Sequence, residues 1–113
     1  MATVYKNVSG VPASAGVTNY NTLYSTTAST TAVLSTIAVC NQGASTASFR
    51  IAIDDTGGTS APSTAEFFVF DASAAANDTI FITIGATLAN SRHLKFSASA
   101  TTVSFTAFIS EIS

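Results

Sequence analysis

The segment from Thr102 to Ile112, TVSFTAFISEI, decides the fold class of this chain. Hydrophobic residues stand at every second position, at Val103, Phe105, Ala107 and Ile109. Successive side chains of an extended chain point to opposite faces, so this alternation is typical of a half-buried β-strand.

Similar segments, rich in Val, Ile, Phe, Thr and Tyr, recur along the chain between clusters of Gly, Asn, Asp, Ser and Pro. They predict eight strands, at residues 3–8, 22–26, 32–40, 47–54, 66–71, 79–84, 93–99 and 102–112. The run 71–76 could add one helical turn. Eight short strands in 113 residues predict one all-β domain, an antiparallel β-sandwich over residues 1–113, either jelly-roll or immunoglobulin-like.

The composition excludes several classes of protein. Charged residues make up 9% of the chain, against roughly 25% in an ordinary soluble domain, while Ser and Thr contribute 16 and 18 residues. The hydrophobic content of 47% argues against a disordered tail. Four dispersed basic residues and a net charge of −2 argue against nucleic-acid binding. We expect no membrane segment, because no apolar run is long enough, and no secretory leader at the N-terminus.

The chain carries little catalytic or metal-binding signal. Asp54 and Asp55 are adjacent, so their side chains point apart; we expect a solvated strand end before a Gly-rich loop. A calcium site using these carboxylates and carbonyl groups near Gly57 and Gly58 is the alternative. The single histidine, His93, is predicted to lie on an outward face, beside Arg92 and Lys95.

The single cysteine, Cys40, is predicted to be a small buried thiol, and one Cys with one His cannot make a closed zinc site within a chain. No nucleophile elbow and no phosphate-binding loop are present. We therefore predict no catalytic residue, no cofactor and no metal, and a protein that is not an enzyme.

Two segments are apolar at both odd and even positions, Val33–Val39 and Glu66–Phe70. A strand that is apolar on both faces is usually covered on both faces, and a chain this short has little of its own to cover the second one. This pattern favours contact with another subunit over a locally covering loop. The predicted interface residues are Phe67, Phe68, Val69, Phe70, Leu34 and Phe108.

The strand and turn segments together also resemble a known group of proteins. The segments that carry the likeness are 3–6, 21–24, 33–43, 47–53, 75–79, 83–88, 94–99 and 103–112. Through them the chain resembles the small virion structural proteins of tailed phages, especially phages of cyanobacteria and other aquatic hosts. The likeness runs from end to end but departs in the loop from Asp54 to Ser63, where similar proteins tend to be more basic.

The resemblance implies a structural role in a phage particle, assembled in the host cytoplasm. Our first hypothesis is a capsid cement or decoration protein that forms a homotrimer and binds a major capsid protein. A component of the tail, neck or baseplate, bound to a tail protein, is the near alternative. A glycan-binding module on a host-facing appendage is a further alternative, with Tyr5, Tyr20 and Tyr24 as the candidate stacking residues.

Overall fold

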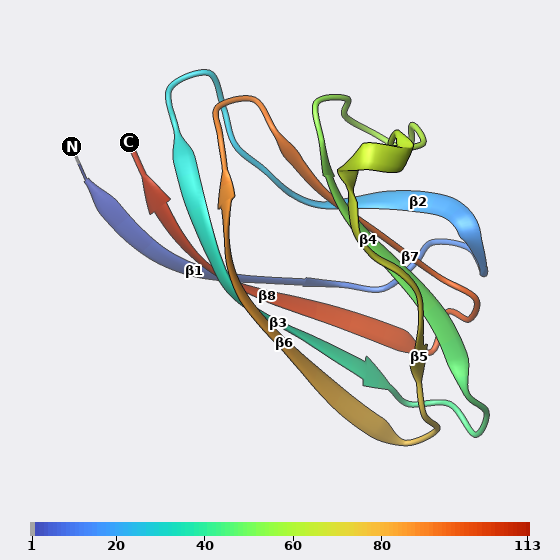
Figure 1. The fold of residues 1–113 in the computed structure, drawn as a ribbon. Coiled ribbons are helices and arrows are strands. Elements are labelled where there is room, and N and C mark those ends of the chain that lie inside the picture. The colour runs from blue at the N-terminus through green and yellow to red at the C-terminus, as the bar shows by residue number, and fades with distance from the viewer. Residues whose placement is uncertain (1) are drawn as a thin grey trace.

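Eight strands and one short 3₁₀ turn make up the structure, a computed structural model that describes residues 2–113 (Figure 1). The strands are β1 (Thr3–Gly10), β2 (Gly16–Ser25), β3 (Thr31–Asn41), β4 (Ala47–Asp54), β5 (Phe67–Ala74), β6 (Asp78–Leu88), β7 (His93–Ala98) and β8 (Val103–Ile112). The turn η1 spans Thr64–Glu66. Each of the eight predicted strands overlaps one of these strands.

The strands form two four-stranded antiparallel sheets. Sheet A has the order β1-β8-β3-β6, and sheet B has the order β2-β7-β4-β5. The first strand pairs with the last, the second with the seventh, the third with the sixth and the fourth with the fifth. A chain paired in this way is one long antiparallel ribbon rolled over itself, which is the jelly-roll arrangement. The strand order therefore decides between the two sandwich topologies that the sequence left open.

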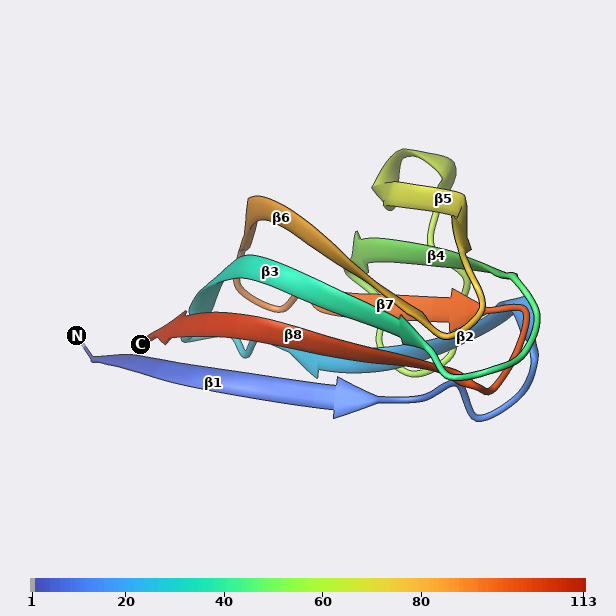
Figure 2. The ribbon, with the colours of Figure 1, turned by 90° about the horizontal axis from the view of Figure 1, so that it is seen from below.

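The core lies between the inward faces of the two sheets. Phe105 of β8 packs against Phe96 of β7 and Phe49 of β4, with ring centroids 4.6 and 6.0 Å apart. The alternation predicted for residues 102–112 is confirmed in β8, because Val103, Phe105, Ala107 and Ile109 are buried and the residues between them are more exposed. β7 does not alternate in this way, since its outward residues Lys95 and Ser97 are buried as well. Reciprocal backbone hydrogen bonds between Ala2 and Ser113 continue the β1–β8 pairing, so the two ends of the chain lie side by side (Figure 2).

A β-bulge explains why the Val33–Val39 segment looked apolar on both faces. The register of β3 shifts between Leu34 and Thr36, at Ser35. Even-numbered side chains therefore face the core before the bulge, and odd-numbered side chains face it after the bulge. Leu34 and Ile37 both point into the core, with 0% and 1% of their surface exposed. The prediction that Leu34 lies in an intermolecular interface is wrong, since its side chain is enclosed between the sheets.

The largest differences from the predicted boundaries lie in β2, β5 and β6, and β6 ends at Leu88 rather than residue 84. β2 begins at Gly16 rather than residue 22, because irregular pairing with β7 carries the strand through polar residues. The run 71–76 contains no helical turn, because Asp71 to Ala74 continue β5, with Asp71 at a φ of 53° beside a register shift. The only turn of helix among residues 2–113 is η1, which precedes β5.

Candidate interaction surface

The outer face of sheet A is a broad surface without charge. Its side chains are those that alternate with the inward-facing residues of the same four strands. We call it the uncharged face; it consists of Thr3, Tyr5, Asn7 and Ser9 of β1, Ser104, Thr106, Phe108, Ser110 and Ile112 of β8, Thr31, Val33, Thr36, Ala38 and Cys40 of β3, and Thr79, Phe81, Thr83 and Thr87 of β6.

The charged residues of sheet A belong to the opposite set of side chains. Among the described residues, the charged residues of sheet A are Lys6, Asp78 and Glu111. Lys6 pairs in register with Ile109, and Asp78 pairs with Asn41. Glu111 pairs with Val4 and Ala32, which also alternate with residues of the uncharged face. Lys6 and Glu111 bond each other, with 3.1 Å between Nζ and Oε1. The uncharged face is therefore polar only through its hydroxyl groups, one amide and one thiol.

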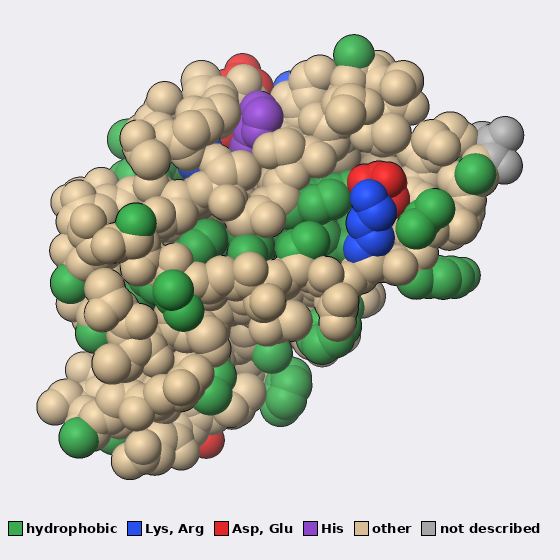
Figure 3. Space-filling view, turned by 180° about the vertical axis from the view of Figure 1, so that it is seen from behind, with side chains coloured by type: hydrophobic (Ala, Val, Ile, Leu, Met, Phe, Trp, Pro, Cys, Tyr) green, Lys and Arg blue, Asp and Glu red, His purple; other side chains and the backbone are tan. Residues whose placement is uncertain are grey.

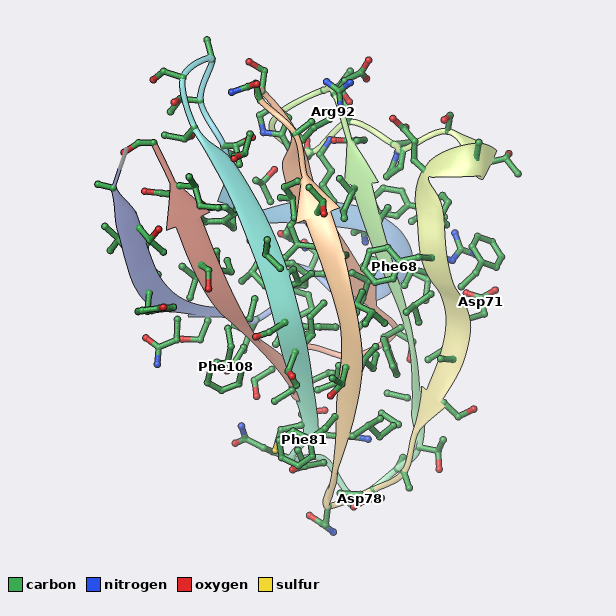
Figure 4. The ribbon with its side chains drawn as sticks, turned by 60° about the vertical axis from the view of Figure 1, so that its left-hand side comes forward. Phe68, Asp71, Asp78, Phe81, Arg92 and Phe108 are labelled. Atoms are coloured by element: carbon green, nitrogen blue, oxygen red, sulfur yellow. The ribbon has the colours of Figure 1, made fainter. Side chains whose placement is uncertain are left out.

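Three aromatic rings stand on the uncharged face, from three different strands. Tyr5, Phe108 and Phe81 are 82%, 40% and 67% exposed. Figure 4 shows Phe108 and Phe81 on the side of the ribbon formed by sheet A. Large exposed apolar groups on one face are typical of interaction sites, because a monomer gains nothing by showing them to water.

The strand register fixes how these rings are arranged. One row across the sheet runs Tyr5, Ser110, Val33, Thr87; the next runs Asn7, Phe108, Thr36, Thr83; the third runs Ser9, Thr106, Ala38, Phe81. Each ring thus lies in a successive row, on β1, β8 and β6. The three rings form a diagonal across the face, with Phe108 between the other two.

The bulge at Ser35 also shapes this face. The Ser35 hydroxyl donates to the carbonyl oxygen of Phe108 over 3.0 Å. A shallow depression of about 410 Å³ lies there, lined by residues of β1, β3 and β8 that include Tyr5, Lys6, Ser35 and Phe108. Of the exposed rings on this surface, the sequence predicted only Phe108 as an interface residue and Tyr5 as a glycan-stacking candidate, because the exposed residues become neighbours only through the pairing of distant strands.

The predicted aromatic segment Phe67–Phe70 lies on β5, at the edge of sheet B. Phe68 and Phe70 are exposed, whereas Phe67 and Val69 are half-buried, and Val69 packs against the core. Phe68 lies toward β6 in Figure 4. The segment therefore does not form one flat apolar surface: two register shifts turn neighbouring side chains in different directions.

Arg50 of β4 packs against part of this aromatic segment. Its guanidinium lies 3.9 Å from the ring centre of Phe70 and binds Asp71 through two hydrogen bonds, of 2.7 and 3.2 Å. It also donates to the hydroxyl of Tyr20 over 2.9 Å. This pairing lowers the pKa of Asp71 below its usual range, through the hydrogen bond from Arg50. Arg50 thus covers one face of Phe70 within the same chain.

A loop of the same chain covers much of the outer face of sheet B. Lys95 of β7 and Asp54 of β4 point outward from this sheet, yet both side chains are completely buried, with 2.9 Å between Nζ and Oδ2. The Nζ of Lys95 also donates to the carbonyl oxygens of Ser60 and Gly57, at 2.8 and 3.3 Å. The segment between β4 and η1 is therefore held down over the sheet.

This arrangement corrects the sequence prediction for Asp54, which is not a solvated strand end. Its carboxylate and the loop carbonyls are the oxygens that the calcium alternative would have used. Here they surround the ammonium group of Lys95, which serves as the cation of the cluster. Among residues 2–113, no group of three or more His, Cys, Asp and Glu is placed to hold a metal ion.

His93 is half-buried beside this loop rather than freely exposed. The Ser25 hydroxyl and the His93 Nδ1 are 2.6 Å apart, which joins β2 to β7. No carboxylate forms a hydrogen bond or an ion pair with His93 in the part of the chain that the structure describes. A serine and histidine alone, without a group that orients the imidazole, do not make the three-residue arrangement of a serine hydrolase.

The candidate glycan-stacking tyrosines do not share one exposed surface. Tyr20 and Tyr24 are 7% and 8% exposed, and only Tyr5 is free on a face. The Tyr24 hydroxyl donates to Glu111, and burial together with this bond raises the pKa of Tyr24 well above its usual value. The hydrogen bonds from Tyr24 and Lys6 in turn lower the pKa of Glu111.

The reverse side of the molecule is hollowed. Seen from behind, hydrophobic side chains gather along a hollow that crosses this side (Figure 3). Val8 of β1 and Leu23 of β2 are partly buried against the core, at the edges of the two sheets.

No helix within residues 2–113 combines the length and the apolar character needed to cross a membrane.

Comparisons with protein-family models, with curated proteins and with solved structures find no match to this chain.

Proposed function

We propose that this chain is a non-enzymatic structural protein of a tailed-phage virion, and that it acts as a capsid cement or decoration protein. Its work is mechanical: it binds other subunits and stabilises the particle through oligomeric contacts. The link to phages depends on the resemblance of the strand and turn segments. The observation that carries a structural role is the uncharged face of sheet A.

The chemistry of that face favours permanent burial. Removing a charge from water costs far more than removing a hydroxyl group that finds a hydrogen-bond partner. The face presents mainly Ser and Thr hydroxyls around three exposed aromatic rings, and its strands direct their charged side chains elsewhere. Such a surface loses little on desolvation and gains from burial of the rings.

The fold and the remaining surface agree with this role. Jelly-roll sandwiches are a recurrent architecture of viral capsid proteins and of lectins, so the fold admits the role without deciding it. The exposed Phe68 and Phe70 lie on β5, the edge strand of sheet B, and so belong to a surface other than the uncharged face. A cement protein needs at least two contact surfaces, one for each neighbour that it joins.

The proposal is tested by adding the purified protein to phage particles from which it has been removed. We expect the protein to be retained on the particles in a density gradient and to raise the temperature at which they release DNA. Retention on isolated tails but not on heads would assign the tail, neck or baseplate role instead. A protein retained on neither, with no effect on particle stability, would overturn the structural role.

A further inference from the structure

We infer that the partner of the uncharged face is a second copy of this chain, packed face to face across a two-fold axis. This inference rests on the proposed function, because it names the occupant of the surface that supports that function. It specifies a dimer contact in place of the trimer expected at first, since a two-fold contact joins the same patch of both subunits.

The hydroxyl groups make the face complementary to itself. A hydroxyl both donates and accepts hydrogen bonds, whereas a carboxylate only accepts and an ammonium group only donates. The Thr36 and Thr83 hydroxyls already bond each other across β3 and β6, at 3.3 Å. A second sheet with the same hydroxyl groups can therefore satisfy this one, which a surface bearing charges of one sign could not do.

The charge distribution also permits two copies to meet here. The chain has a net charge of −2, so two copies repel each other weakly at long range. The outward side chains of sheet A are uncharged, and Lys6, which also lines the depression, is paired with Glu111, so the contact places no unpaired like charges together. A partner with a strongly charged surface would gain no ion pair from this face and would lose hydration.

The area is sufficient for a specific dimer. Four strands about 4.8 Å apart, the shortest spanning about 27 Å at about 3.4 Å per residue, give a face of about 500 Å². Two such faces bury about 1,000 Å² in total, which reaches the lower limit for a specific interface. The contact is therefore expected to be reversible, with a dissociation constant in the micromolar range.

The diagonal of rings shows how the two copies fit. A two-fold axis along the diagonal places each ring against its own mate. An axis across the diagonal, through Phe108, places Tyr5 of one copy against Phe81 of the other. Phe108, between the other two rings, meets its own mate in both cases, so it is the residue to test.

Sedimentation equilibrium of the full chain at micromolar concentrations tests the inference without any particle. We expect a monomer–dimer equilibrium in the wild type. Phe108→Asp and Phe81→Asp should each raise the dissociation constant by at least about thirtyfold, as loss of a buried aromatic contact does. Phe70→Asp is the matched control, since it places the same charge on the exposed ring of sheet B and should leave the equilibrium unchanged.

A cross-link tests the symmetry directly. In a Cys40→Ser background, Phe108→Cys should give a disulfide-linked dimer under mild oxidation, and Phe70→Cys should not. Phe81→Asp keeps the test valid if Phe108→Asp fails to fold. Phe81 is 67% exposed on an edge strand, so its substitution should disturb the fold less than substitution of Phe108. Circular dichroism and the unfolding midpoint of each variant confirm that it is folded.

The outcomes separate this inference from the proposed function. A monomeric wild type, a trimer, or a dimer weakened by Phe70→Asp and not by Phe108→Asp would overturn the inference. A monomer that binds particles only when Phe108 is intact would assign the face to the capsid or tail protein instead. A dimer that behaves as expected but binds no particle would overturn the proposed function alone.

Discussion

The Nζ of Lys95 lies 2.9 Å from the Oδ2 of Asp54, and neither side chain is exposed to solvent. The two residues stand on the adjacent strands β7 and β4, on the face of sheet B that the loop after β4 covers. Apart from this pair, Lys95 binds two loop carbonyls, so the ammonium group joins the loop to the sheet. The pair thus keeps one face of the sandwich covered by its own chain, while the opposite face stays open.

Replacing Lys95 with Met should destabilise the protein strongly. The substitution leaves the Asp54 carboxylate buried without its counter-ion, and removing one partner of a buried ion pair typically costs about 3–5 kcal/mol. Urea unfolding followed by circular dichroism measures this change.

The double variant Asp54→Leu, Lys95→Met is the control for that measurement. It removes both charges, so it should recover much of the loss, because an apolar pair of similar volume often equals a buried ion pair. A single Lys95→Met variant as stable as the wild type would show that the pair does not hold the loop.

The sequence predicted the strands well and this loop poorly. Alternation is a local property, so the inward row of β8 could be predicted directly from neighbouring residues. The burial of Asp54 depends on Lys95, 41 positions away, and on carbonyl groups of a loop with no hydrophobic pattern. No rule of spacing joins such groups, so the covered face became visible only in the fold.

Asn41 holds together the loops at one end of the sandwich, and Asn41→Ala should be destabilising. Its side-chain amide donates to the carbonyl oxygens of Ser45 and Ala74, at 2.9 and 3.0 Å, and its Oδ1 accepts from the amide of Gly43. Each buried partner left unsatisfied costs about 1–3 kcal/mol, so we expect a loss of at least about 2 kcal/mol.

Asn90→Ala is a suitable comparison for that variant. Asn90 makes a single exposed hydrogen bond, to the carbonyl oxygen of Thr30. Its removal should change the unfolding free energy by less than about 1 kcal/mol. Equal losses in the two variants would contradict the role given to Asn41.

Gly85 forms the bulge of β6 opposite Ser35, with a φ of 59°. A Cβ at this position would meet open space, so the effect of Gly85→Ala is purely conformational. We expect a loss of about 1 kcal/mol in the unfolding free energy, because an L-residue is strained at positive φ. Gly85→Asn should lose less, since Asn tolerates this region; a smaller loss for Ala than for Asn would argue against the bulge.

The contact of Glu111 with Tyr24 and Lys6 gives the stability a dependence on pH. The pKa of Glu111 is lowered in the folded protein. Glu111 therefore stabilises the fold fully above about pH 4.3, the usual pKa of a glutamate, and this stabilisation is lost as the pH falls through the lower pKa of the folded protein. The pKa of Tyr24 is raised, so stability should decline again above about pH 10.

Glu111→Gln isolates this contribution. The variant should show a shallower loss of stability in acid than the wild type, in unfolding free energies measured from pH 7 to pH 2. Asp78→Asn is the control, because it removes an exposed carboxylate that accepts a hydrogen bond from the backbone amide of the next residue, Thr79. An acid profile changed as much by Asp78→Asn as by Glu111→Gln would contradict the role of Glu111.

The uncharged face illustrates why the candidate site was only partly predictable. Low charge and abundant hydroxyls are visible in the composition, and they indicated a surface intended for burial. The rings of Tyr5, Phe81 and Phe108 share this face because β1, β6 and β8 are neighbours in sheet A, or neighbours of a common strand. The sequence instead indicated Leu34, which points into the core because of the bulge at Ser35. It also indicated Phe67–Phe70, whose side chains point in different directions because of two register shifts.

The reactivity of Cys40 tests most directly whether the uncharged face is covered when the protein is assembled. Cys40 is the only cysteine of the chain, lies on this face and is partly exposed. Its labelling rate with a maleimide should fall at least tenfold between dilute and concentrated protein, and Phe108→Asp should restore the fast rate at high concentration. A rate independent of concentration, with particles absent or present, would contradict the burial of this face.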